Sequence, residues 1–343
     1  MKNEKIDFIE HDPKHKIIWD IIAQYSESAW FTHLADWIEI ENQWNIEPHS
    51  FMVVQGGLVV GIVPLYLIKK RGFRYLMSGY KGWGGPAFLT DVKEDTIKAT
   101  YNHIDSIAKK TEAEWIEVSL PLGIEPTGLV SYGFKVERAN TSVINLEKNT
   151  IEKIYNKIDK KCRYEIRKSE KLRLNIQFTE ALSLDDIKEY YKIHVENYKR
   201  TGAPPNPFWY FEDLYKRFNH DGIVRFFFIE ENNKKVAAAS IAVYKNHAIY
   251  LTGSSLNESL SKGYNHVLQW NIIKILYDME GVSFYEMGEI ENSTEKAKSL
   301  GKFKESFGGD LHLIYKAVKV YKTTKYKLYQ ILKRMKRWNS LKK

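Results

Sequence analysis

The sequence predicts an α/β fold of two tandem domains, each with a twisted mixed sheet flanked by helices. Strand-like and helical segments alternate through the second half of the chain, and similar elements recur in the first half. Helical crossovers between strands imply parallel pairing in an α/β sheet. The second-half elements are, in order, a strand at Ala248–Leu251, a helix at His266–Met279, a strand at Val282–Met287, a short helix around Ala297–Glu305 and a strand at His312–Val320.

The first half begins with helical patterns and becomes rich in strands. Apolar residues at helical spacing predict helices within residues 1–50, and a further helix is predicted at Asp95–Lys109. Phe51–Val54 and Leu58–Ile68 have the composition of two strands, and Gly56-Gly57 supplies the hairpin turn between them.

Matching elements of the two halves lie at nearly equal offsets. Met52 corresponds to Phe227, 175 residues later, and Trp115 corresponds to Phe284, 169 residues later. Near-equal offsets indicate two copies of one α/β unit, although low identity between the copies leaves a coincidence of patterns as the alternative. The predicted organisation is a first domain at 1–150, a second at 151–320 and a basic amphipathic helix at 321–343.

Composition narrows the class of protein. The chain has 343 residues, of which 43% are hydrophobic and 14% aromatic, enough for packed cores. Cys162 is the one cysteine, which excludes an internal disulfide framework and fits a reducing compartment. The N-terminus has no apolar segment of signal-peptide length, and runs such as Leu58–Ile68 are too short to span a bilayer. We therefore expect a soluble cytoplasmic protein.

Short motifs for metals and nucleotides are missing from the sequence. The ten histidines form no HExxH pair, and there is no CxxC motif, so no metal site is expected. Neither a Walker loop nor a GxGxxG motif occurs, which argues against ATP chemistry or a Rossmann cofactor. We expect no tightly bound cofactor.

The net charge of +9 is concentrated at the C-terminus. Residues 321–343 contain nine Lys or Arg and no acid, so the rest of the chain is formally neutral. A basic amphipathic helix of this kind is typical of contact with an anionic membrane surface, here the inner face. The alternative is a terminal helix that packs its apolar face on the second domain. That face comprises Leu328, Ile331, Leu332, Met335 and Trp338.

The segment GKFKESFGG at Gly301–Gly309 follows a strand that ends at Met287-Gly288. It resembles the late motif of the Fem peptidyltransferase (FemABX) family and of the related FemAB-like acyltransferases, both within the GNAT superfamily. The resemblance covers nearly all of the second half and, more loosely, the first. It implies tandem GNAT-like domains and transfer of an acyl group to an amine.

Three residues are predicted to be catalytic. Lys304 matches a lysine that the Fem family uses near the reacting centre, in a Phe-Lys-x-x-Phe-Gly context that includes Phe303. An ammonium group is suited to stabilise an oxyanion or a phosphate leaving group. Glu286 is the candidate proton acceptor, because it lies where many FemAB-like enzymes have Asp. A surface lysine and an ordinary strand-end carboxylate are the alternatives.

A basic helix and a proline-rich loop are candidate binding elements. Arg163 and Arg167 belong to a segment similar to the helix that opens the second Fem-type domain, and such cations can hold phosphate groups. Arg200 belongs to an Arg-x-Gly-x-Pro-Pro element that the FemAB-like acyltransferases share, after a helix with Ser183 as its expected N-cap. A solvated helix face is the alternative for the basic segment.

Two loops supply the other predicted substrate-binding residues. The glycine-rich loop from Ser78 to Pro86 contributes Tyr80, Lys81 and Trp83, although its glycines are equally suited to a tight connection. Lys262 and Tyr264 lie in a loop that is a degenerate form of the GNAT loop for the pyrophosphate of CoA.

These observations predict an N-acyltransferase that acts on an amine of a cell-envelope precursor, either peptidoglycan or an amino sugar, in soluble or lipid-linked form. Its donor is aminoacyl-tRNA, as in the Fem enzymes, or acyl-CoA, as in GNAT enzymes generally. The degenerate loop disfavours CoA, and the lack of a long helical arm in the second half counts against a grip on tRNA. The alternatives are a CoA-dependent N-acetyltransferase for a small-molecule or sugar amine, and a non-enzymatic membrane-surface binding protein.

Overall fold

The structure is a computed structural model that describes residues 4–171, 176–202, 204–291 and 293–341. The chain divides into two compact units. Unit 1 comprises Met1–Ala139 and Leu313–Lys343, and unit 2 comprises Asn140–His312. The C-terminal segment that the sequence analysis set apart therefore lies within unit 1. Both units have the predicted α/β character, with sheets flanked by helices.

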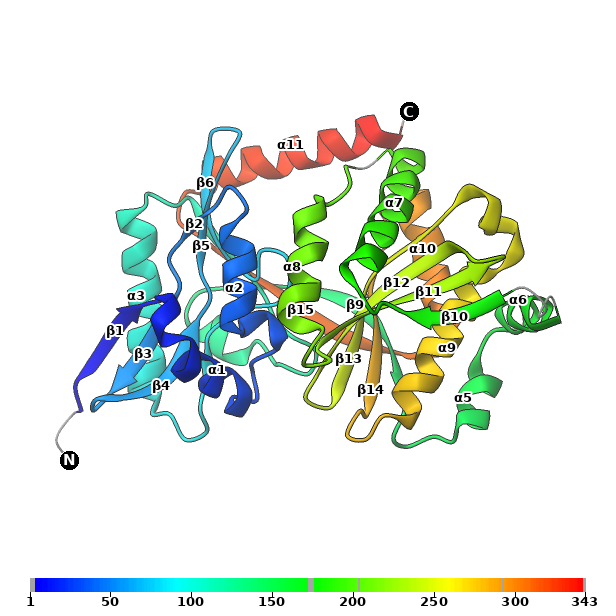
Figure 1. Ribbon diagram of the computed structural model, residues 1–343. Coiled ribbons are helices and arrows are strands. Elements are labelled where there is room, and N and C mark those ends of the chain that lie inside the picture. Colours follow the sequence, from blue (N-terminus) through cyan, green and yellow to red (C-terminus); the bar gives the residue numbers. More distant parts are fainter. Residues whose placement is uncertain (1–3, 172–175, 203, 292, 342–343) are drawn as a thin grey trace. The chain divides into compact units, whose positions relative to one another are not determined.

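Unit 2 is built on a mixed sheet (Figure 1). Its strands follow the order β10-β11-β12-β13-β14-β9, in which β13 and β14 are parallel and the other neighbours antiparallel. The strands are β9 (Lys135–Asn145), β10 (Ile176–Glu180), β11 (Val224–Glu231), β12 (Lys234–Tyr244), β13 (His247–Ser255) and β14 (Phe284–Ile290). The helices are α5 (Ile151–Lys157), α6 (Lys160–Lys171), α7 (Leu184–Thr201), α8 (Phe208–Phe218), α9 (Tyr264–Asp278) and α10 (Glu295–Glu305), with a 3-10 turn at Asn257–Lys262 before α9.

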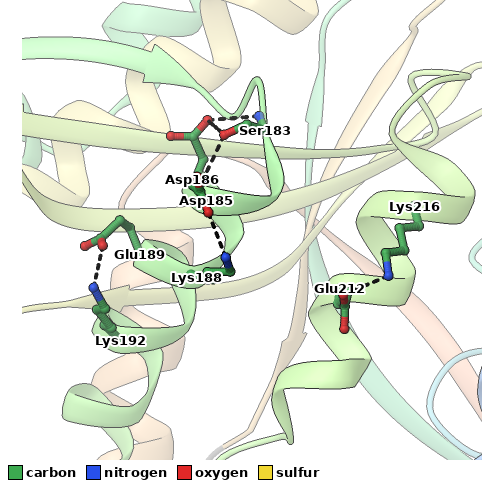
Figure 2. Close-up of polar contacts among 8 residues, drawn as sticks. All are labelled: Ser183, Asp185, Asp186, Lys188, Glu189, Lys192, Glu212 and Lys216. Atoms are coloured by element: carbon green, nitrogen blue, oxygen red, sulfur yellow. Dashed lines mark hydrogen bonds and ion pairs between the residues drawn. The ribbon is translucent and has the colours of Figure 1, made fainter.

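Helix α7 begins where the sequence predicted. The Ser183 hydroxyl accepts a hydrogen bond from the Asp186 backbone N–H at 3.3 Å, and the Asp186 carboxylate accepts in return from the Ser183 N–H at 3.0 Å. Figure 2 shows this reciprocal cap and the ion pairs along α7 and α8. The cap satisfies N–H groups that the first helical turn leaves open. At the other end, Gly202 ends the helix with a positive φ of 68°.

Unit 1 contains two sheets. The first has the antiparallel order β1-β3-β4-β7, and the second includes β15-β8-β6-β5-β2, with β6 and β8 parallel. The strands are β1 (Ile6–Glu10), β2 (Glu47–Pro48), β3 (Phe51–Gln55), β4 (Leu58–Val63), β5 (Tyr66–Lys70), β6 (Phe73–Ser78), β7 (Ala87–Phe88), β8 (Trp115–Ser119) and β15 (Asp310–Val320). The helices are α1 (Lys16–Tyr25), α2 (Ala35–Asn42), α3 (Glu94–Lys110), α4 (Thr127–Ser131) and α11 (Thr323–Leu341), with 3-10 turns at Pro13–His15 and Phe31–His33.

The predicted strand Leu58–Ile68 is wrong in one respect, because it consists of two strands in different sheets. The break falls at Pro64, between β4 and β5. Proline has no N–H to give to a strand ladder. The Ser50 hydroxyl accepts from the Leu65 N–H at 3.0 Å, in place of a ladder bond. Strands on both sides of this break contribute to the buried core of unit 1, together with α3.

Helix α11 packs on unit 1 through tyrosines. The Tyr329 ring lies 4.7 Å from the Trp115 ring and 5.4 Å from Phe73, and Tyr326 lies 5.4 Å from Trp115. The predicted apolar face is not the packed one: Leu328, Ile331, Leu332 and Met335 are all exposed. The Trp338 side chain lies outside the described part of the structure. In that part, no helix is long and apolar enough to cross a membrane.

Candidate functional site

Two parallel strands of unit 2 separate as they run toward their C-terminal ends. β13 and β14 pair at His247–Ile249 and Phe284–Glu286. Beyond these pairs, β13 follows β12 to Ser255, whereas β14 follows β9 to Ile290. We call this divergence the β13–β14 fork. Backbone groups that two parallel strands cease to share are free to meet a ligand, and ligands in α/β sheets bind at the carboxyl ends of strands.

Lys304 of α10 lies at this fork. Its Nζ donates a hydrogen bond to the Glu289 carbonyl oxygen at 2.9 Å. A Cβ at Gly288 would lie 3.2 Å from the Lys304 Nζ and 3.9 Å from the Tyr250 carbonyl oxygen of β13. Gly288 also has a φ of +84°, which favours glycine. The absence of a side chain at residue 288 therefore leaves the space in which the ammonium lies.

The Fem-like segment fixes α10 to its surroundings at both ends. Thr294 caps the helix, because its hydroxyl accepts from the Ala297 N–H at 3.0 Å. Beyond the helix, a Cβ at Gly308 would lie 2.4 Å from the Lys157 carbonyl oxygen, and one at Gly309 would lie 2.5 Å from the Ser142 hydroxyl. Both glycines thus permit backbone approaches that any side chain would block.

Phe303 lies on α10 immediately before Lys304. Its half-buried ring packs edge-to-face with Phe307 and with His266 of α9, with ring centres 5.2 Å apart in both pairs. Phe307 is fully buried. The aromatic pair therefore attaches α10 to the first turn of α9 and helps to fix the helix that carries Lys304.

Glu286 lies in the sheet beside the fork and is fully buried, with 0% of its surface exposed. The Thr141 hydroxyl of β9 donates to its Oε1 at 2.7 Å, and the His247 Nε2 of β13 lies 3.3 Å from its Oε2. Three neighbouring strands therefore contribute polar groups to one buried cluster. A buried carboxylate needs such partners, because burial alone strongly disfavours its charge.

The electrostatics of Lys304 reflect opposing influences. Burial lowers the pKa of its ammonium below the ordinary lysine value, while the negative charges of Glu286, Glu289 and Glu291 oppose that shift. Lys304 consequently loses its proton more readily than an exposed lysine does, yet it lies in a region of negative potential that favours the cation. This balance suits a group that meets a developing negative charge.

The start of α9 is surrounded by carboxylates. Both oxygens of Glu231 accept from the Lys262 ammonium at 2.7 Å, and the Tyr264 hydroxyl donates to Glu231 at 2.6 Å. A Cβ at Gly263 would lie 2.7 Å from a carboxylate oxygen of Glu165. The two predicted binding residues thus engage an acid of the same unit. The positive charge of Lys262 is therefore compensated at the position where a GNAT loop would hold a pyrophosphate.

The three predicted arginines are not brought to one point by the contacts that the structure describes. Arg163 donates to the Asn156 carbonyl at 2.7 Å, and Arg167 is exposed on the same helix. Arg200, at the end of α7, donates to the Asn197 side chain at 2.5 Å. Burial, followed by the nearby charge of Arg200, lowers the pKa of Lys296 at the start of α10. Arg200 therefore contributes positive potential near the helix that carries Lys304.

In unit 1, the glycine-rich loop after β6 folds back onto its own strands. The Gly84 N–H donates to the Ser119 carbonyl at the end of β8 at 2.7 Å, and the Gly85 N–H donates to the Ser78 hydroxyl at 2.8 Å. The Trp83 carbonyl accepts from Thr32 at 2.7 Å. These contacts make the loop a tight connection within unit 1, and the binding role of Tyr80, Lys81 and Trp83 stays a prediction.

Tyr80 and Lys81 lie at the tip of this loop, beside a buried acid that the sequence analysis missed. The Lys81 ammonium lies 4.0 Å from the centre of the Trp44 ring. Its backbone N–H donates to Oε1 of Glu41 at 2.9 Å. Only 1% of Glu41 is exposed, and burial raises the pKa of its carboxyl to about 7, against the lowering effect of the Lys81 hydrogen bond. Helix α2 carries three acids, and nothing in the sequence distinguishes Glu41 as the one that is buried.

The chain is similar to known proteins in sequence and in fold. Residues 156–299 match the family model described as an acetyltransferase (GNAT) domain. A crystal structure of FemX superimposes with a TM-score of 0.73 at 15% identity, covering 94% of this chain and 99% of that chain. L-PGS from Bacillus licheniformis gives 0.60 at 13% identity, covering 91% and 93%. A tandem GNAT protein from the clavulanic acid biosynthesis pathway gives 0.56 at 8% identity, covering 92% and 98%. No curated protein matches the sequence.

The chain is therefore a tandem GNAT-fold protein, with a recognisable GNAT domain in its second half. The predicted resemblance to the Fem-type proteins is confirmed at the level of the fold, by this domain and by the structure of FemX. The roles assigned to individual residues stay predictions.

Proposed function

We propose that this protein is an N-acyltransferase that transfers an aminoacyl or acyl group to an amine of a cell-envelope precursor. The observation that carries the proposal is the Lys304 ammonium at the β13–β14 fork, held by the Glu289 carbonyl. A fork at which two parallel strands separate, with a cation beside it, is suited to bind an acyl carbonyl and to stabilise its oxyanion.

The proposed reaction joins the acceptor nitrogen to the acyl carbon. The neutral amine attacks the carbonyl, its oxygen becomes negative beside Lys304, and the ester or thioester bond then breaks. The leaving oxygen or sulfur takes the electron pair, and the proton from the amine ends on that group or in solvent. Lys304 lowers the energy of the charged intermediate without forming a bond to it.

In our proposal, Glu286 supports this chemistry as a buried negative charge near Lys304. It is fully buried and bonded by Thr141, so its carboxylate is held away from solvent. A fixed negative charge near Lys304 favours the protonated lysine that the oxyanion needs. We therefore assign Glu286 the role of a positioned counter-charge, in place of the proton acceptor expected from sequence.

The donor that we favour is aminoacyl-tRNA. The carboxylates of Glu165 and Glu231 lie around the start of α9, where a GNAT enzyme would bind the pyrophosphate of CoA. Glu231 already pairs with Lys262, so the positive charge of Lys262 is neutralised and does not serve a pyrophosphate. The name of FemX, and that of L-PGS, which denotes a lysylphosphatidylglycerol synthetase, support a cell-envelope acceptor, either a peptidoglycan precursor or a lipid-linked amine.

The test is a mass-spectrometric screen of donors against acceptors. Charged tRNAs and acyl-CoAs are offered with amine-bearing muropeptides, amino-sugar nucleotides and lipid-linked amines. Lys304→Met should lower turnover by about 100- to 1000-fold, the usual cost of one oxyanion contact. Lys302→Met, on the exposed face of the same helix, is the matched control and should leave turnover unchanged. Wild-type turnover by a folded Lys304→Met variant would remove Lys304 from the mechanism, and product from acyl-CoA alone would reverse the choice of donor.

A further inference from the structure

Helix α11 leaves a second face that packing on unit 1 does not use. The packed face is aromatic: Tyr326 and Tyr329 contact Trp115, and Tyr329 also contacts Phe73. At 3.6 residues per turn, Leu328, Ile331, Leu332 and Met335 project from roughly the opposite side. We call these four residues the aliphatic stripe. Packing of the tyrosines fixes the rotation of the helix and so fixes the direction of the stripe.

The aliphatic stripe is exposed over its whole described length. Its residues expose 47%, 53%, 43% and 57% of their surfaces, in chain order. A single exposed leucine is ordinary, but four on successive turns of one helix form a continuous apolar strip. Such a strip gains free energy from any contact that removes it from water.

Cations border the stripe. Lys327 and Arg334 fall along one of its edges and Lys325 along the other, and all three are exposed. Residues 321–343 contain nine Lys or Arg and no acid, against a chain net charge of +9. The partner of this surface must therefore be negative at its boundary and apolar within.

We propose that α11 docks on an anionic phospholipid surface, with the aliphatic stripe in the interfacial layer and the flanking cations among the headgroups. RNA would satisfy the cations but leave the aliphatic side chains in water. A second copy of the chain, stripe against stripe, would bring two sets of like-charged flanking residues together. A bilayer surface accommodates both features at once.

Vesicle flotation tests this proposal with the full-length protein. The vesicles are phosphatidylcholine alone, or equal parts of phosphatidylcholine and phosphatidylglycerol. We expect wild-type protein to float with the anionic vesicles and to be released as salt rises from about 0.1 M to about 1 M, because the Debye length falls from about 10 Å to about 3 Å. Ile331→Gln/Leu332→Gln should weaken binding by about tenfold or more, since it removes the apolar part of the contact.

Matched control variants distinguish this contact from nonspecific electrostatic and hydrophobic binding. Ile17→Gln/Leu182→Gln changes two side chains that are 77% and 87% exposed elsewhere, and should bind as wild type does. Lys327→Gln/Arg334→Gln should lose anionic binding. Lys188→Gln/Lys216→Gln removes the same net charge from residues that already pair with acids at 2.8 and 2.7 Å (Figure 2). This variant should keep its binding to anionic vesicles.

Three outcomes would overturn the proposal. The first is equal flotation of the wild-type protein and the stripe variant. The second is binding to RNA, but not to anionic vesicles, that requires Lys327 and Arg334. The third is a dimer in light scattering that the stripe variant abolishes, without vesicle binding. Because flotation requires no turnover, its failure would leave the proposed acyl transfer standing.

Discussion

Replacing Glu41 by glutamine should remove a pH dependence of stability from unit 1. The side chain is buried, and its folded pKa of about 7 compares with an ordinary value of 4.5. An acid with a raised folded pKa binds a proton more tightly in the folded state. Its protonated form therefore stabilises the fold below pH 4.5, and that contribution is lost as pH rises to about 7. The full difference corresponds to about 3 kcal/mol.

The measurement is urea unfolding of the wild-type protein and of Glu41→Gln between about pH 5 and about pH 8. Over this range their difference in unfolding free energy should grow by about 2–3 kcal/mol in favour of the variant. Tryptophan fluorescence suits this test, because six of the nine tryptophans lie within residues 1–139. Glutamine keeps an oxygen for the Lys81 N–H, and any constant offset between the proteins is immaterial. Glu39→Gln, on the same helix, is the control. A difference that stays constant with pH would refute the argument.

Two further variants probe the fork. Gly288→Ala should destabilise by about 1–2 kcal/mol through its positive φ and should also lower turnover, because the new Cβ would lie 3.2 Å from the Lys304 Nζ. Gly281→Ala has the same strain at a φ of +80° with no atom within 4 Å, so it should destabilise alike in denaturation and spare turnover; equal activity of the two variants would contradict this reasoning. Thr141→Val should cost about 1–3 kcal/mol in urea unfolding, because the buried Glu286 carboxylate loses a donor. Thr141→Ser should recover most of that loss. If Thr141→Ser restores neither stability nor turnover, the hydroxyl is not the group that matters.

The sequence was sufficient to predict structural features that depend on residues close together in the chain. The cap at Ser183 and the helix that carries Lys304 depend on residues within a few positions of one another, and both were predicted. The hydrogen-bond and ion-pair partners of Glu286 and Glu231 were not predicted. Thr141 and Glu286 meet across 145 residues, and Lys262 meets Glu231 across 31 residues. Such contacts depend on strand order and register, which periodicity does not specify.

The face of α11 shows a different limit. The spacing of Leu328, Ile331, Leu332 and Met335 identified an apolar stripe correctly, but the helix packs by Tyr326 and Tyr329 on another side. Hydrophobic spacing shows that a face is apolar without showing what covers it. Tyrosine also escapes a pattern based on aliphatic residues, although its ring supplies much of the packing area at such contacts.

The C-terminal ends of the parallel strands differ between the two units. Among the strand pairs that the structure describes, β6 and β8 are parallel in unit 1, and β13 and β14 are parallel in unit 2. After β6 the chain folds back, and Gly84 binds the end of β8, so the loop occupies the space between the strand ends. After β13 the chain leads away to α9, and β14 diverges with Gly288 and the Lys304 ammonium beside it. The C-terminal ends of the two parallel pairs therefore differ: those of β6 and β8 are joined by backbone contacts of the glycine-rich loop, whereas β13 and β14 diverge beside Lys304.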